Sequence, residues 1–184
     1  MEAKLNNSVM AFLLAIFVST TACGALKPEE SHEFDGTKAL PFELKTTDGK
    51  TVSLRNFEGR PFLFVFFASW CPPCRAELTQ LSKIHETYTQ ESLGILAVAV
   101  DSTETPETTK DVAPLASSLK LPFTVALATE QVTRDYHFKG IPTTIVLDAK
   151  GRIVRTFYGY HEMEKLEPIL QAVIVHKKDS VRSP

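Results

Sequence analysis

The sequence predicts one α/β domain, built as a central mixed sheet flanked by helices. Apolar runs typical of buried strands alternate with segments of helical periodicity, which is the order expected of a layered α/β fold. Alternating residues around Asp48-Gly49 predict an N-terminal β-hairpin, and a helical insert separates the second buried strand from the third. A chain of 184 residues is long enough for one such domain with extensions.

The composition is that of an ordinary folded protein. Hydrophobic residues make up 43% of the chain, charged residues 23%, and the formal net charge is −2. With so small a net charge, nothing favours a nucleic-acid partner. The three cysteines, Cys23, Cys71 and Cys74, are too few for a disulfide-stapled scaffold, and a close pair with a distant singleton suggests two separate roles.

The first residues predict a targeting segment. A polar start, an apolar run over about residues 9–18 and small residues after it have the layout of a secretory signal. The apolar run is shorter than the roughly 20 residues that span a membrane. Its end resembles a bacterial lipoprotein signal, although Thr20 stands where a large aliphatic residue is usual. We therefore expect residues 1–22 to be a signal peptide and Cys23 to be lipidated.

Residues 23–38 are polar and read as a tether between the lipid anchor and the domain. Two alternatives stay open: cleavage near Ala22 or Ala25 would release a soluble protein, and an uncleaved leader would itself anchor the chain. Each alternative places the domain outside the cytoplasm, in the bacterial periplasm or on the outer face of the cytoplasmic membrane.

The domain itself is expected over residues 39–176, and its first half contains two buried strands. The hairpin covers residues 42–54, and the apolar run FLFVFFA at residues 62–68 predicts a strand buried on both faces. The cysteine pair ends that strand, and helical spacing of apolar residues follows over about residues 73–88. Residues 94–100 predict a second buried strand, parallel to the first.

The helical insert is expected to begin at Thr105, with Pro106 in its first turn, and to be interrupted or kinked at Pro114. A short strand at residues 123–127 and a short helix at residues 129–138 follow.

The last elements are a hairpin and a closing helix. The hairpin covers residues 143–159, with its turn at Asp148 to Gly151. The amphipathic helix covers residues 161–176 and should tolerate Pro168 only if it bends there, and residues 177–184 are expected to be a frayed tail.

The stretch ASWCPPCRAEL places a cysteine pair at the start of a helix, where exposed amides and the helix dipole stabilise an anion. In such motifs the pKa of the first thiol lies between about 3.5 and 7.5, against about 8.5 for a free cysteine. Cys71, at the open end, is expected to attack a substrate disulfide, and Cys74, buried one turn into the helix, to resolve the mixed disulfide. Pro72 and Pro73 stiffen the loop between them.

Three other interpretations of the pair are weaker. A static disulfide would close too small a ring to constrain the unfolded chain. A zinc site needs two more ligands, and the sequence has no second C-x-x-C or H-x₃-H motif. A copper-binding chaperone using Cys71, Cys74 and His137 remains as the alternative function, although His137 is more typical of a surface residue. The four other histidines form no ligand spacing.

Two motifs together carry a family resemblance. FFASWCPPC after a buried strand, with GIPTTIVLDAKGRIV about 70 residues later, resembles thioredoxin-fold proteins of the TlpA/ResA type over about residues 38–176. These are membrane-tethered, extracytoplasmic thiol–disulfide oxidoreductases, and several act as reductants in cytochrome c maturation. The resemblance implies protein disulfide substrates such as apocytochrome c, a membrane thiol electron donor and no cofactor or metal. Reducing and oxidising members share the motif, and the resemblance favours a reductase.

The resemblance also implies roles for individual residues. Cys71 and Cys74 match the redox-active disulfide pair, and Trp70 matches the residue that flanks it. Pro142 matches the cis-proline, whose loop faces the cysteines and exposes the backbone of Ile141 to pair with a substrate strand.

One departure concerns the proton acceptor for the second thiol. Thioredoxin has a buried aspartate six residues before its first cysteine, and this chain has Val65 there. We therefore expect Glu104, after the second buried strand, to take the proton from Cys74, with Asp101 as the other candidate. A peroxiredoxin function is disfavoured, because the pattern Pro-x-x-x-Thr-x-x-Cys is absent.

Overall fold

The computed structural model describes residues 36–88, 92–103 and 110–182. The strands are β1 (Glu43–Lys45), β2 (Thr51–Ser53), β3 (Phe62–Phe67), β4 (Gly94–Ala99), β5 (Thr124–Leu127), β6 (Thr143–Leu147) and β7 (Ile153–Tyr158). The helices are α1 (Pro72–Thr87), α3 (Val112–Ser118), α4 (Glu130–Asp135) and α5 (Met163–Arg182), with the short 3-10 helices η1 (Leu54–Phe57) and η2 (Val100–Thr103).

The sheet has five strands in the order β5-β4-β3-β6-β7. β3 is parallel to β4 and antiparallel to β6, so the sheet is mixed and the predicted parallel pairing is confirmed. β3 lies at the centre, and all six of its residues are buried, as its continuous apolar sequence predicts. The separate pair β1–β2 forms the predicted N-terminal hairpin, with the turn at Asp48-Gly49.

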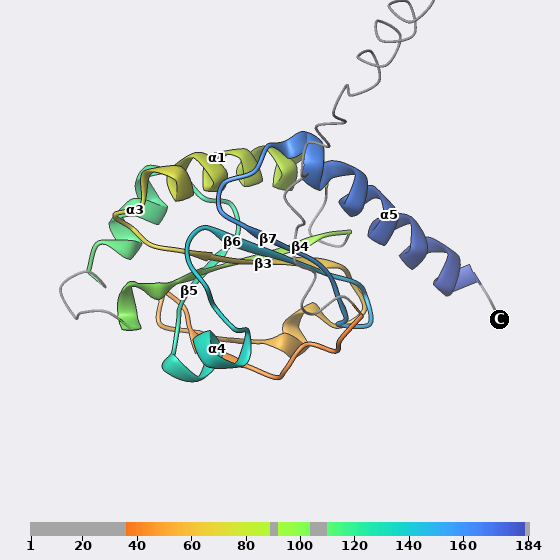
Figure 1. The fold of residues 1–184 in the computed structure, drawn as a ribbon, viewed down its shortest axis with the longest axis horizontal. Coiled ribbons are helices and arrows are strands. Elements are labelled where there is room, and N and C mark those ends of the chain that lie inside the picture. The colour runs from red at the N-terminus through yellow and green to blue at the C-terminus, as the bar shows by residue number, and fades with distance from the viewer. Residues whose placement is uncertain (1–35, 89–91, 104–109, 183–184) are drawn as a thin grey trace, which may run out of the picture.

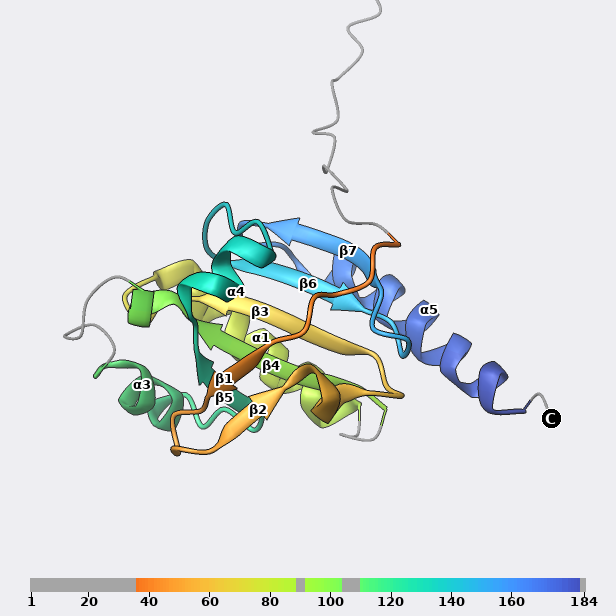
Figure 2. The same ribbon diagram turned by 90° about the horizontal axis from the view of Figure 1, so that it is seen from below.

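The helices cover both faces of this sheet. α1 and α5 lie on one face, and α4 and the β1–β2 hairpin lie on the other (Figures 1 and 2). Aromatic residues fill the second interface: the ring of Phe42, just before β1, stacks on Phe64 of β3 at 4.8 Å between centroids, and Tyr136 packs edge-on against Phe64 at 4.8 Å. The hairpin region is therefore part of the core.

Two expectations about the helices need correction, the interruption at Pro114 and the end of the closing helix. Pro114 does not interrupt the helical insert, because α3 begins at Val112 and places this proline in its first turn, where an amide hydrogen has no intrahelical partner. Thr105 and Pro106 lie outside the described residues. α5 continues through Pro168 and on to Arg182, past the predicted end at residue 176. Its buried residues Leu166 and Leu170 anchor it to the domain, which offsets the missing backbone hydrogen bond.

Within residues 36–88, 92–103 and 110–182, none of the helices has the length and apolar character needed to cross a membrane. The predicted signal peptide, Cys23 and most of the tether lie outside the described residues.

Candidate active site

The cysteine pair lies where the central strand meets α1. β3 ends at Phe67, and after a short turn Cys71 forms the N-cap of α1. Cys71 and Cys74 are joined by a disulfide, with 5.3 Å between their Cα atoms. Cys74 is completely buried and Cys71 is 3% exposed, so in this oxidised form only Cys71 presents any surface to an incoming molecule.

The two prolines select which amide faces the sulfur of Cys71. Pro72 and Pro73 occupy the first two positions of α1 and carry no amide hydrogen, so the amide of Cys74 is the first donor of the helix. It donates to Sγ of Cys71 at 3.3 Å. The same donor and the helix dipole would stabilise a thiolate on Cys71 once the disulfide is reduced.

A set of hydrogen bonds fixes the turn before Cys71. The amide of Ser69 donates to both carboxylate oxygens of Asp101 at 3.0 Å, and the Ser69 hydroxyl donates to Asp101 Oδ1. On the other side, Nε and Nη2 of Arg75 donate to the Ser69 carbonyl at 3.0 and 2.7 Å. Asp101 is completely buried at the carboxyl end of β4, and these bonds give it a positioning role in this turn.

Trp70 projects from the same turn. Its side chain is 51% exposed, which is unusual for a large apolar residue beside a buried disulfide. The turn therefore presents an exposed aromatic ring next to Cys71 in the sequence.

The Pro142 loop lies at the same edge of the sheet. Phe66 pairs with Thr143, so the residues just before β6 lie beside the end of β3, from which the cysteine turn departs. The Ile141–Pro142 peptide bond is cis. The Pro142 carbonyl accepts a hydrogen bond from the Gly159 amide at 2.8 Å, which ties the loop to the end of β7.

Sequence reasoning missed a buried acid, Glu77 of α1. It lies three residues after Cys74, on the same face of the helix, and is completely buried. The hydroxyl of Thr144 donates to its Oε1. Burial raises the pKa of Glu77 from 4.5 to about 7, against the opposing effect of the Thr144 hydrogen bond. A carboxyl that titrates near neutral pH can both accept and release a proton under working conditions.

Strand register relates Glu77 to the position of Val65. Val65 of β3 stands where thioredoxin has its buried aspartate, and it is the direct partner of Thr144 on β6. Since Thr144 binds Glu77, the buried carboxyl of this chain comes from helix α1 and contacts the strand neighbour of Val65. The other predicted acid, Glu104, lies outside the described residues.

The copper alternative gains no geometric support. Among the residues that the structure describes, no group of three or more His, Cys, Asp or Glu side chains could hold a metal ion. His137, which that alternative requires beside the cysteine pair, therefore forms no such cluster with Cys71 and Cys74 there.

Comparisons with known proteins agree with this geometry. The family model described as "AhpC/TSA family" matches residues 36–156. The thioredoxin-like protein YneN of Bacillus subtilis is 32% identical over 133 residues, 72% of this chain and 76% of the relative. Sporulation thiol-disulfide oxidoreductase A of the same organism is 29% identical over 159 residues, 84% of this chain and 94% of the relative.

Solved structures show the same likeness. A putative thiol:disulfide interchange protein DsbE from Chlorobium tepidum superposes with a TM-score of 0.67 at 28% identity, covering 77% of this chain and 96% of that one. StoA from Bacillus subtilis superposes with a TM-score of 0.59 at 29% identity, covering 70% of this chain and 95% of that one.

Peroxidatic chemistry does not follow from the family match. Counting back from Cys71, Phe64 and Ala68 stand where the peroxidatic pattern has Pro and Thr. The pair in C-x-x-C spacing, the mixed sheet and the relatives together show a dithiol enzyme of the ResA type. The chain belongs to the AhpC/TSA family and is a thioredoxin-fold thiol–disulfide oxidoreductase.

Proposed function

We propose that this oxidoreductase reduces disulfides of proteins outside the cytoplasm, for example those of apocytochrome c during cytochrome c maturation. In this proposal lipidated Cys23 tethers the domain to the membrane, where a membrane thiol protein returns electrons to the oxidised pair. The observation that supports this reaction most directly is the arrangement around the disulfide. The sulfur of Cys71 accepts a hydrogen bond from a helix amide, and Glu77, whose carboxyl has a pKa near 7, lies one helical turn after Cys74.

The reaction begins with the reduced pair. The Cys71 thiolate attacks one sulfur of the substrate disulfide, and the other substrate sulfur leaves as a thiolate that takes a proton from water. Cys74 then gives its thiol proton to the Glu77 carboxylate and attacks Sγ of Cys71. The second substrate sulfur leaves and is protonated, so the substrate ends as two thiols and the enzyme as the Cys71–Cys74 disulfide. Glu77 returns its proton to solvent before the next cycle.

The surface around Cys71 supplies a place for the substrate chain. Trp70 offers an exposed ring next to Cys71. Ile141 lies in the loop just before β6, whose first residue, Thr143, pairs with Phe66 near the end of β3. An extended substrate segment could pair with the Ile141 backbone and pack on Trp70, which would hold its disulfide over Cys71.

An oxidised C-x-x-C-H peptide, which has the cysteine spacing of a c-type haem attachment site, tests the proposal. The reduced enzyme should reduce this peptide, Cys71→Ser should show no exchange, and Cys74→Ser should accumulate a mixed disulfide between Cys71 and the peptide, detectable by mass. Full exchange activity in Cys71→Ser would contradict the assigned roles.

The anchor needs a separate test in bacterial cells. Cys23→Ser should move the protein from the membrane fraction to the soluble extracytoplasmic fraction or leave an uncleaved leader. A protein that stays membrane-bound and fully processed in this variant would rule out lipidation at Cys23.

A further inference from the structure

A buried histidine adjoins Glu77 from a distant part of the chain. His161 lies between β7 and α5, and its Nδ1 is 3.7 Å from Oε1 of Glu77. The two side chains are only 6% and 1% exposed. Glu77, Thr144 and His161 therefore meet beneath α1 although 84 residues separate the first from the last.

The histidine ring is held in one orientation. It stacks on Phe157 of β7, with 4.4 Å between ring centroids and 10° between the planes. Its Nδ1 also lies 3.5 Å from the Gly159 carbonyl oxygen. Because Nδ1 faces a carbonyl oxygen and a carboxyl oxygen, the arrangement favours the tautomer with hydrogen on Nδ1, which turns the positive edge of the ring towards Glu77.

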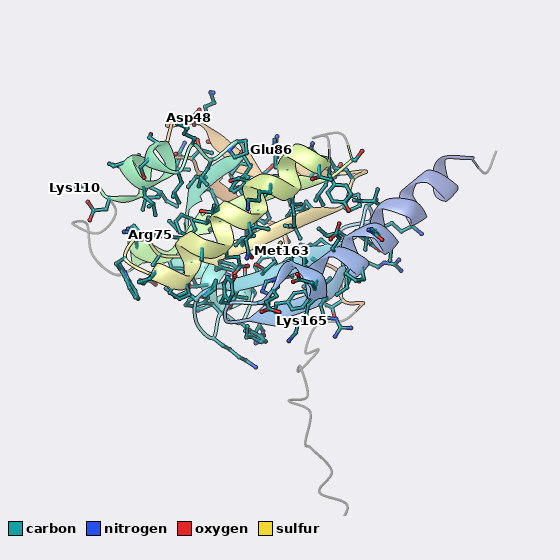
Figure 3. All side chains as sticks on the ribbon, turned by 90° about the horizontal axis from the view of Figure 1, so that it is seen from above. Asp48, Arg75, Glu86, Lys110, Met163 and Lys165 are labelled. Atoms are coloured by element: carbon teal, nitrogen blue, oxygen red, sulfur yellow. A yellow bond between two sulfur atoms is a disulfide. The ribbon has the colours of Figure 1, made fainter. Side chains whose placement is uncertain are left out.

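The polar and ionisable groups near Glu77 and His161 come from several elements. Thr144 of β6 donates to Glu77, His161 lies beside it, and Cys74 is on the same face of α1. Tyr160 and Glu162, on either side of His161, line a groove of about 430 Å³ between α1 and α5. Figure 3 shows Met163, at the start of α5, beside α1. The other ionisable groups lining this groove are Lys83, Tyr88, Glu164 and Glu167.

We propose that His161 is a positioning residue for the exchange reaction: its ring stabilises the Glu77 carboxylate and so keeps Glu77 able to accept the proton of Cys74 at neutral pH. Burial alone favours the protonated carboxyl, which cannot accept a proton. A hydrogen-bearing or protonated imidazole at this distance opposes that effect. The inference rests on the proposed proton transfer from Cys74 to Glu77, and it adds the group that sets the pH at which this transfer works.

The direct test is a ¹³C NMR titration of the Glu77 side-chain carboxyl in the oxidised protein, in which neither cysteine titrates. His161→Phe keeps an aromatic ring on Phe157 and should raise the Glu77 midpoint by about one pH unit. His161→Gln can retain an N–H donor and should give a smaller shift. His85→Gln is the control. His85 lies on α1, the helix that carries Glu77, but its ring packs near Phe123, with 6.1 Å between the ring centroids.

The second readout is the pH profile of peptide reduction by the reduced protein. The pH at which the rate rises should move upward with the NMR midpoint, leaving the rate well above that pH almost unchanged. An unshifted Glu77 midpoint in both His161 variants would overturn the inference. A shifted midpoint with an unshifted rate profile would support the Glu77–His161 pairing and contradict the proposed proton transfer instead. If His161→Phe does not fold, His161→Gln decides the same question.

Discussion

Replacing Glu77 by glutamine should make the oxidised protein more stable at pH 8 and less active. In the folded protein the pKa of Glu77 is about 7, raised by burial from 4.5. Between these two values the folded state binds a proton that the unfolded state has lost, so stability falls as pH rises, by about 1.4 kcal/mol per pH unit. Over the whole interval the loss is about 3 kcal/mol, and it is complete above pH 7.

Glutamine has the shape of the protonated acid and does not ionise, so Glu77→Gln should lack this loss. We expect equal stability of the two proteins near pH 4 and an advantage of about 3 kcal/mol for the variant at pH 8. Urea unfolding of the oxidised proteins at several pH values measures the difference without any cysteine titration.

Glu86→Gln provides the matched control. Glu86 is exposed in the C-terminal half of the same helix (Figure 3), so its variant should stay within about 0.5 kcal/mol of the parent at every pH. A Glu77→Gln protein that is less stable than the parent at pH 8, or that keeps the parent's pH dependence, would refute a neutral-range carboxyl at this site.

Three further substitutions probe the surroundings of the pair. Asp101→Asn should destabilise the fold by about 2 kcal/mol and slow exchange, because its amide nitrogen cannot accept from the active-site turn. Trp70→Ala should raise the KM for a peptide substrate while stability stays within about 0.5 kcal/mol, since the ring is half exposed. Gly94→Ala should cost about 1–3 kcal/mol, because its Cβ would lie 2.6 Å from the buried Phe57 ring and 3.1 Å from Phe62 Cβ.

These expectations have distinct controls. Thermal unfolding and peptide-reduction kinetics, measured on the same preparations, separate the stability effects from the substrate effects. A Trp70→Ala enzyme with an unchanged KM would remove Trp70 from the substrate surface. An Asp101→Asn protein of full stability and activity would show that the turn needs no buried acceptor, and a fully stable Gly94→Ala protein would show that Phe57 can shift at little cost.

Local patterns were sufficient to predict the frame of the site. The apolar run at Phe62–Phe67 and the glycine-led run at Gly94–Ala99 predicted buried strands, and the cysteine motif between them predicted a helix start. These signals are strong because a continuous apolar run and helical spacing are both patterns of residues that are close together in the sequence. The interruption predicted at Pro114 was wrong. A proline in the first turn of a helix cannot be distinguished from one in its interior until the first residue of the helix is known.

The acid of the site was harder to predict. Glu77 does carry a signal, since it continues the buried stripe of Cys74, Leu78 and Leu81 on α1, where a carboxylate is costly. The family resemblance directed attention to the end of β4 instead, where Asp101 bonds to the cysteine turn. His161 carries no local signal at all, because its neighbour Glu77 is brought to it only by the packing of α1 and the β7–α5 connection against the sheet.

The most direct measurement for the account as a whole is the reduction potential of the Cys71–Cys74 couple in equilibrium with glutathione or dithiothreitol. A reductant of protein disulfides should have a potential near that of thioredoxin, about −270 mV. A potential near −120 mV would mark an oxidant and contradict the proposed direction of electron flow.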